Sequence, residues 1–212
     1  MSICFAITDA DWALTKDVIT AVTSALGVVV AAWVGIGGLY TWKTQLRGKA
    51  DHELGLRMLA EVYKFEMILN TARSPHLFPH EVEKSSQDTP PDRYDFHERL
   101  EAGFERRIQG VTSAFAEVAA LGFNAQALWG RGISKEVSEL EFLKNEYSEY
   151  VRLKVLSTDP REPKDERMDH KIFLEGRRSV FENLFDKADE YGRDLKSCVQ
   201  RIEGLVRPKL IK

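Results

Sequence analysis

The chain has 212 residues, with a hydrophobic fraction of 43% and a charged fraction of 30%, values that describe an ordinary soluble domain with one core. Its formal net charge of -3 argues against a nucleic-acid-binding protein, because such proteins carry a strongly basic surface. The cysteines, Cys4 and Cys198, stand near opposite ends of the chain, which excludes a disulfide framework and suits a reducing compartment. The averages hide a division, since residues 18–42 carry no charge and the rest is densely charged.

The uncharged segment from Val18 to Trp42 is longer than the roughly 20 residues that cross a hydrocarbon core of about 30 Å. Trp12 precedes it, and Tyr40 and Trp42 close it, as aromatic side chains do at membrane–water interfaces. A cleaved signal peptide would begin with basic residues and have a shorter apolar run. A helix buried in a soluble core is the other alternative. We predict one transmembrane helix over 18–42, after a short N-terminus over 1–17.

Basic residues mark one side of this segment. Lys43, Arg47 and Lys49 follow it, whereas Lys16 is the one cation before it. The positive-inside rule then places residues 43–212 in the cytoplasm and the N-terminus outside. The same three cations are expected to contact lipid phosphates.

Small residues recur every three or four positions within the predicted span. Such a face lets two helices approach closely in lipid, where packing drives association. We therefore predict a homo-oligomer, although glycine and alanine are also simply common in membrane helices. The predicted packing face consists of Ser24, Gly27, Ala31, Gly35 and Gly38.

The remaining segments show apolar residues at steps of three and four, which is typical of amphipathic helices. No segment alternates with the period of two that strands require. We predict an all-α protein, in which a helical bundle follows the span, with a loop over 75–92 that Pro75 begins. The predicted apolar stripes are Leu54, Met58, Val62, Phe65 and Leu69; Phe96, Leu100, Phe104, Ile108, Val111, Phe115 and Val118; and Val137, Leu140, Leu143, Tyr147 and Val151.

Helix ends are predicted from single residues. Gly122 is expected to cap the second of these helices, and Ser134 to be the N-cap of the third. The last helix is expected to keep one apolar face from Phe173 to Leu205 and to end at Pro208, with a length of about 50–60 Å.

Catalytic and metal-binding motifs are missing from the sequence. His76, His80, Glu81 and Glu83 stand in proline-rich, irregular chain without zinc-ligand spacing. Phosphate-binding loops and serine-nucleophile elbows are absent, and Cys198 lies on an apolar helix face, as a packing residue does. We expect no metal, no cofactor and no enzymatic activity. A site assembled from residues distant in sequence is the remaining alternative.

Arginines offer the strongest candidate binding groups, because a guanidinium presents a fork of donors to phosphates and carboxylates. Two adjacent pairs flank apolar stripes, so their side chains would converge if the helices are neighbours. The alternative is that they pair with Glu or Asp across helices. The predicted anion or partner site consists of Arg73, Arg106, Arg107, Arg177 and Arg178.

The segment Leu39-Tyr-Thr-Trp42-Lys43-Thr-Gln45-Leu46-Arg47-Gly48-Lys49 resembles one in uncharacterised bacterial single-pass membrane proteins. In those proteins the pattern Trp-Lys-x-Gln-Leu-x-Gly-Lys directly follows the span and precedes a helical domain. The resemblance implies a bacterial inner-membrane location and brings no known activity.

The expected function is a membrane-anchored helical module for interaction, sensing or scaffolding. Its expected partners are the lipid bilayer, further copies of itself and another protein. The alternative is an oligomeric membrane effector, of the toxin or anti-phage type, whose spans disturb the bilayer when the helical domain is triggered.

Overall fold

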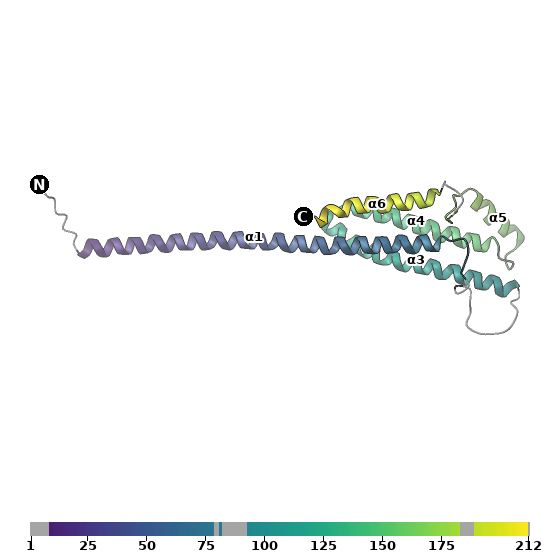
Figure 1. Cartoon of the computed structure of the whole chain (residues 1–212), viewed down its shortest axis with the longest axis horizontal. Coiled ribbons are helices and arrows are strands. Elements are labelled where there is room, and N and C mark those ends of the chain that lie inside the picture. The colour runs from purple at the N-terminus through teal and green to yellow at the C-terminus, as the bar shows by residue number, and fades with distance from the viewer. Residues whose placement is uncertain (1–8, 79–80, 82–92, 183–188, 212) are drawn as a thin grey trace. The chain divides into compact units, whose positions relative to one another are not determined.

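The structure, a computed structural model, describes residues 9–78, 81, 93–182 and 189–211. Every regular element in these residues is a helix (Figure 1), so the predicted all-α class is confirmed. The chain divides into two compact units, Met1–Ala50 and Asp51–Lys212. Helix α1 (Asp9–Ala72) begins in the first unit and ends in the second.

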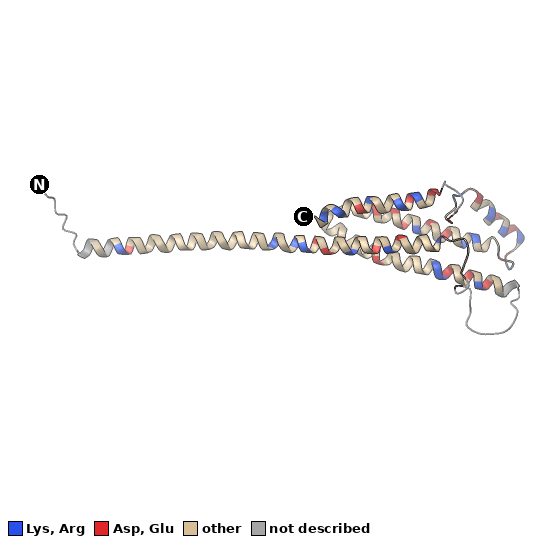
Figure 2. Cartoon of the chain, viewed as in Figure 1, with Lys and Arg blue, Asp and Glu red and all other residues tan. Residues whose placement is uncertain are grey.

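The described residues of the first unit, from Asp9 on, form an exposed helix with an uncharged middle. Its residues from Val18 to Trp42 carry no charged side chain, and Figure 2 shows this stretch of α1 without blue or red. By length and composition, the helix over Thr15–Ala72 is the one candidate among the described residues for crossing a membrane, and none of its most apolar window is buried.

The second unit is a helical bundle. It consists of the last part of α1 with α3 (Arg93–Trp129), α4 (Arg131–Leu156), α5 (Lys164–Glu175) and α6 (Glu190–Leu210). Helix α4 packs against α3, α5 and α6 (Figure 1). The core side chains follow the predicted stripes, for example Phe65 of α1, whose ring lies edge-on to Phe115 of α3 at 5.6 Å between centroids. Helix α1 ends before Pro75, as predicted.

The turn between α3 and α4 is made by Gly130. Its backbone has φ of 90°, in the region that side chains disfavour, so glycine is needed to reverse the chain within one residue. The predicted helix end at Gly122 is wrong, because α3 continues to Trp129. A Cβ on Gly122 would lie 3.1 Å from Val137, so this glycine permits the close approach of α3 and α4.

Two further expectations about helix ends were wrong, and the predicted apolar stripes extend less far than expected. Ser134 lies inside α4, whose N-cap is Gly130, and its hydroxyl donates to the Arg131 carbonyl. Pro208 lies within the last turn of α6, which ends at Leu210. At the edges of the predicted stripes, Phe96, Phe173 and Leu205 are exposed.

The predicted continuous helix from Phe173 to Leu205 is also wrong. Helix α5 ends at Glu175, residues 176–182 are not helical, and α6 begins at Glu190. The segment after α5 bonds instead to the end of α1, where Val180 accepts from Arg73 Nε at 2.8 Å and Glu182 N donates to the Arg73 carbonyl at 3.0 Å. These tertiary hydrogen bonds replace the helical ones that the periodicity predicted.

Candidate functional site

The carboxyl end of α1 is surrounded by buried polar groups, among them the side chains of Arg73 and Arg107. The last carbonyls of a helix have no partner within the helix, and a cation near them is favoured by the helix dipole. Here the Ala72 carbonyl accepts from Tyr147 Oη at 2.9 Å and from Arg107 Nη1 at 3.2 Å. Side chains of α3 and α4 thus fix the position at which α1 ends.

Arg107 is buried and surrounded by acceptors. Its Nε and Nη2 donate to the two carboxylate oxygens of Glu81 at 2.7 and 2.6 Å. Its remaining donors meet the carbonyls of Ala72, Ser74 at 2.6 Å and His76 at 2.8 Å. All of its N–H groups are therefore engaged within the chain, which leaves none for an external anion.

Arg73 joins the end of α1 to the start of α6. Its Nη2 pairs with Asp189 Oδ1, and Asp189 Oδ1 also accepts from Gly192 N at 2.9 Å as the N-cap of α6. Burial raises the pKa of Asp189, but the hydrogen bonds from Arg73 and Gly192 outweigh burial, so the pKa lies below the ordinary carboxyl value. A Cβ on Gly192 would collide with this carboxylate and lie 2.8 Å from Arg73 Nη1.

Arg178 lies beside Tyr191 of α6, as Arg73 does. It makes a bidentate pair with Glu146, at 2.7 Å for each bond, and a further ion pair with Asp194. Its Cζ lies 5.4 Å from the centroid of the buried Tyr191 ring, and that of Arg73 lies 5.1 Å from it. The Tyr191 hydroxyl donates to the Leu143 carbonyl at 2.6 Å, and burial raises the pKa of this phenol far above its ordinary value.

The predicted arginine site is therefore divided among separate carboxylates. Arg73 and Arg178 meet at one tyrosine ring, whereas Arg107 pairs with Glu81. Arg106 donates to the Glu81 carbonyl, and Arg177 pairs with Glu149 at 3.1 Å. A groove of about 500 Å³ lies beside Arg177 and Arg178, but Glu146 and Glu149 line it as well. The contacts agree with the alternative of pairing across helices.

A second buried polar cluster joins the start of α3 to the turn after α4. His97 Nε2 lies 3.5 Å from Asp159 Oδ2, and both side chains are almost fully buried. The hydrogen bond from Arg161 lowers the pKa of Asp159, despite the opposing effect of burial. Arg161 also reaches Glu101 on α3 at 2.6 Å. Sequence reasoning missed this cluster, since Asp159 and Arg161 stand in a proline-bounded turn that gave only a helix-breaking signal.

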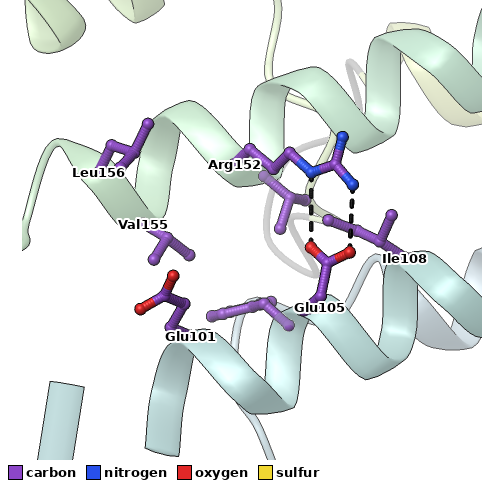
Figure 3. Close-up of a pocket in the computed structure, with 8 residues that line it drawn as sticks. Glu101, Glu105, Ile108, Arg152, Val155 and Leu156 are labelled. Atoms are coloured by element: carbon purple, nitrogen blue, oxygen red, sulfur yellow. Dashed lines mark hydrogen bonds and ion pairs between the residues drawn. The ribbon is translucent and has the colours of Figure 1, made fainter. Parts of the chain in front are cut away.

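A small cavity lies between α3 and α4. Phe104, Ile108, Val151, Val155 and Leu156 make its apolar wall, and its volume is about 190 Å³. Figure 3 shows the Glu105 carboxylate reaching the Arg152 guanidinium across the two helices, at 3.1 Å. The volume is below the roughly 300–1,000 Å³ of typical small-molecule sites, so this space suits a single apolar group.

Metal-ligating and nucleophilic groups do not gather in the described residues. No group of three or more His, Cys, Asp or Glu side chains there is arranged to hold a metal. His80 and Glu83 lie outside the described residues, as does Cys4. Cys198 is buried, and burial raises the pKa of its thiol to about 11, so it is protonated near neutral pH.

The predicted span presents its small residues to open space. A Cβ added at Gly27, Gly35 or Gly38 would meet no atom within 4 Å, and Ser24 and Ala31 are exposed. Its threonine hydroxyls bond back to the helix, as Thr23 does to the Ile19 carbonyl at 2.7 Å, and this satisfies them without water. The predicted interface residues also lie on α1 and are exposed. They are Trp12, Tyr40, Trp42, Lys43, Arg47 and Lys49.

Comparison with known proteins adds no relative. No protein-family model matches the chain, and neither a curated protein nor a solved structure matches it.

Proposed function

We propose that the protein is a non-catalytic interaction module, anchored in the bacterial inner membrane by residues 18–42 of α1, with residues 43–212 in the cytoplasm. The observation that carries the proposal is the exposed apolar surface of this segment. Contiguous apolar patches above a few hundred Å² mark binding or membrane surfaces, and here every described side chain from Thr15 to Leu46 is exposed. Water is an unfavourable solvent for such a helix, and lipid is a favourable one.

The bundle supports an interaction role more than a catalytic one. Its charged side chains fix helix ends, as buried Arg107 does for α1 and half-buried Asp189 does for α6. Such a network holds the helices in one arrangement, so the outer faces of the bundle are presented in a fixed geometry to a partner.

Membrane extraction and topology mapping test the anchoring. We expect the full chain to stay in the membrane pellet after alkaline carbonate washing and to be released by detergent. A fluorescent protein fused after Lys212 should fluoresce, whereas alkaline phosphatase fused there should be inactive, because the C-terminus is cytoplasmic. Release by carbonate would refute the anchor, and the opposite reporter pattern would refute the orientation.

Self-association is proposed to use the face formed by Ser24, Gly27, Ala31, Gly35 and Gly38. Gly35→Leu should weaken cross-linking between copies in membranes, because the bulky side chain separates the helices. Gly37→Leu is the matched control, since successive residues turn by about 100° and Gly37 lies on roughly the opposite side. Equal cross-linking of both variants and the unmodified chain would contradict this role of the face.

A second candidate is the oligomeric membrane effector. The open glycine-rich face favours it, because spans that pack through small residues can repack when the attached domain changes. This candidate predicts that induced expression depolarises the bacterial membrane and stops growth, and that Gly35→Leu restores both. Normal membrane potential during strong expression, with and without stress, would contradict it.

A further inference from the structure

One end of the bundle combines exposed apolar and basic side chains. The contacts within the second unit define this end. Trp129 Nε1 donates to Asp51 at 2.9 Å, and the His52 ring lies 3.2 Å from the Leu210 carbonyl. The first residues of the bundle, the turn between α3 and α4, and the last turn of α6 therefore lie together. We call this surface the end face, and define it by Phe123, Leu128, Arg131, Arg207, Lys209 and Ile211.

The apolar members of the end face lack cover within the chain. Phe123 is 74% exposed, Leu128 is 45% exposed and Ile211 is 86% exposed. Each of these side chains stands within the last turns of α3 or directly after α6. A mixture of exposed large apolar residues with Lys and Arg is the composition of surfaces that bind the membrane interface.

The charge of the end face is unusual at the start of α4 and ordinary at the end of α6. The first turn of α4 contains no acidic residue and begins with Arg131, although the helix dipole favours acids there. The last turn of α6 contributes Arg207 and Lys209. Glu203 offsets Arg207 through an ion pair, and Asp51 accepts from Trp129. The surface therefore complements an anionic partner.

The short connection between the proposed span and the bundle indicates which anionic partner lies within reach. Asp51 follows Trp42, the end of the proposed span, by nine residues. Nine residues reach at most about 30 Å even when fully extended. The end of the bundle that contains Asp51 is thus tethered close to the bilayer, and the cytoplasmic leaflet is anionic.

We propose that the end face docks on the anionic lipid surface of the membrane that holds the span. This inference rests on the proposed anchoring and adds to it a lipid contact made by the bundle itself. The apolar side chains enter the headgroup region, and Arg131, Arg207 and Lys209 contact lipid phosphates.

The test uses the full chain in nanodiscs of phosphatidylcholine alone or with added phosphatidylglycerol. Backbone hydrogen exchange is measured for residues 128–135 and 206–211. We expect exchange there to be at least fivefold slower with the anionic lipid, about the factor that corresponds to one Lys or Arg near a charged membrane. Exchange at α5, beyond the other end of α4, should be the same in both lipids.

Charge-reversal variants locate the effect. Arg131→Glu with Arg207→Glu and Lys209→Glu should remove the dependence on anionic lipid. The matched control reverses the same number of exposed cations, Lys164, Lys171 and Arg193, on α5 and at the start of α6. Loss of the dependence in both variants would show nonspecific attraction and overturn the proposal.

The lipid comparison on the unmodified chain does not depend on the folding of any variant. Equal exchange of the end face in both lipids would overturn the docking while leaving the anchor intact. Release by alkaline carbonate, by contrast, would refute the anchor itself, so the two failures are distinguishable.

Discussion

The two units of the chain differ in how their side chains are satisfied. In residues 18–42 the side chains are uncharged and exposed, and the threonine hydroxyls that lie among them, such as that of Thr23, bond to the helix itself. In the bundle, buried arginines connect elements far apart in sequence, as Arg73 connects the end of α1 to the start of α6. The side chains of residues 18–42 therefore face the surrounding solvent, whereas the buried side chains of the bundle contact other parts of the chain. Changes in the two units should therefore have different consequences.

The largest effect is expected from charges placed in the proposed span. Val30→Arg with Val34→Arg should abolish stable insertion, since each arginine at the centre of a membrane helix costs about 2.5–3.5 kcal/mol on insertion scales. Carbonate extraction measures the result, and Val30→Leu with Val34→Leu is the control that keeps the segment apolar. Retention of the arginine variant in the pellet would show that something other than this segment holds the chain.

A smaller loss is expected when Arg107 is removed from the bundle. Arg107→Ala removes the guanidinium donors from the Glu81 carboxylate and from the carbonyls of Ser74 and His76. Breaking a buried charge pair costs about 3–5 kcal/mol, measured as the free energy of unfolding of the detergent-solubilised chain. Arg107→Lys should recover little of it, because an ammonium group does not present a planar fork of donors.

The control for Arg107 is an ion pair of the same kind on the surface. Arg152 pairs with Glu105 at 3.1 Å, and both side chains are substantially exposed. Arg152→Ala should cost less than about 1 kcal/mol. Equal losses in the two variants would contradict the view that burial and the complete set of acceptors make Arg107 important.

The contrast between the units also explains what could be predicted from the sequence. Helical periodicity depends on neighbouring residues, so the apolar helix over 18–42 and the stripes around Phe65, Phe115 and Tyr147 were predictable. The identity of each arginine's partner was not predictable, because Arg73 and Asp189 are brought together only by the folded bundle. The same reason accounts for the divided last helix, since the bonds of Val180 and Glu182 to Arg73 are tertiary.

Acid should weaken the bundle at the contact between α1 and α6. The folded-state pKa of Asp189 lies below its ordinary value, so the contribution of this group is present above the unfolded pKa of about 3.9. It is lost as the pH falls through that value toward the lower folded pKa. Asp189→Asn should flatten the dependence of unfolding free energy on pH between about 5 and 3. The effect is smaller than that of Arg107→Ala, because the Asp189 side chain is 29% exposed and solvent screens it.

An exposed carboxylate provides the reference for this titration. Asp169→Asn, on the exposed surface of α5, should leave the acid dependence of unfolding unchanged. If Asp169→Asn and Asp189→Asn flattened it equally, a general reduction in charge would be the cause, and the contact with Arg73 would not.

The smallest expected effects come from two glycines of α6, and they differ in sign. Alanine is favoured over glycine inside a helix by about 1 kcal/mol, so Gly204→Ala, where a Cβ would meet only open space, should stabilise the bundle by up to that amount. Gly192→Ala should destabilise it instead, since its Cβ would collide with the Asp189 carboxylate and crowd Arg73 Nη1. Helix propensity alone predicts that both variants are stabilised. Opposite changes in the free energy of unfolding would therefore show that the polar contact at the end of α1, more than the helical preference of α6, sets the chain's conformation there.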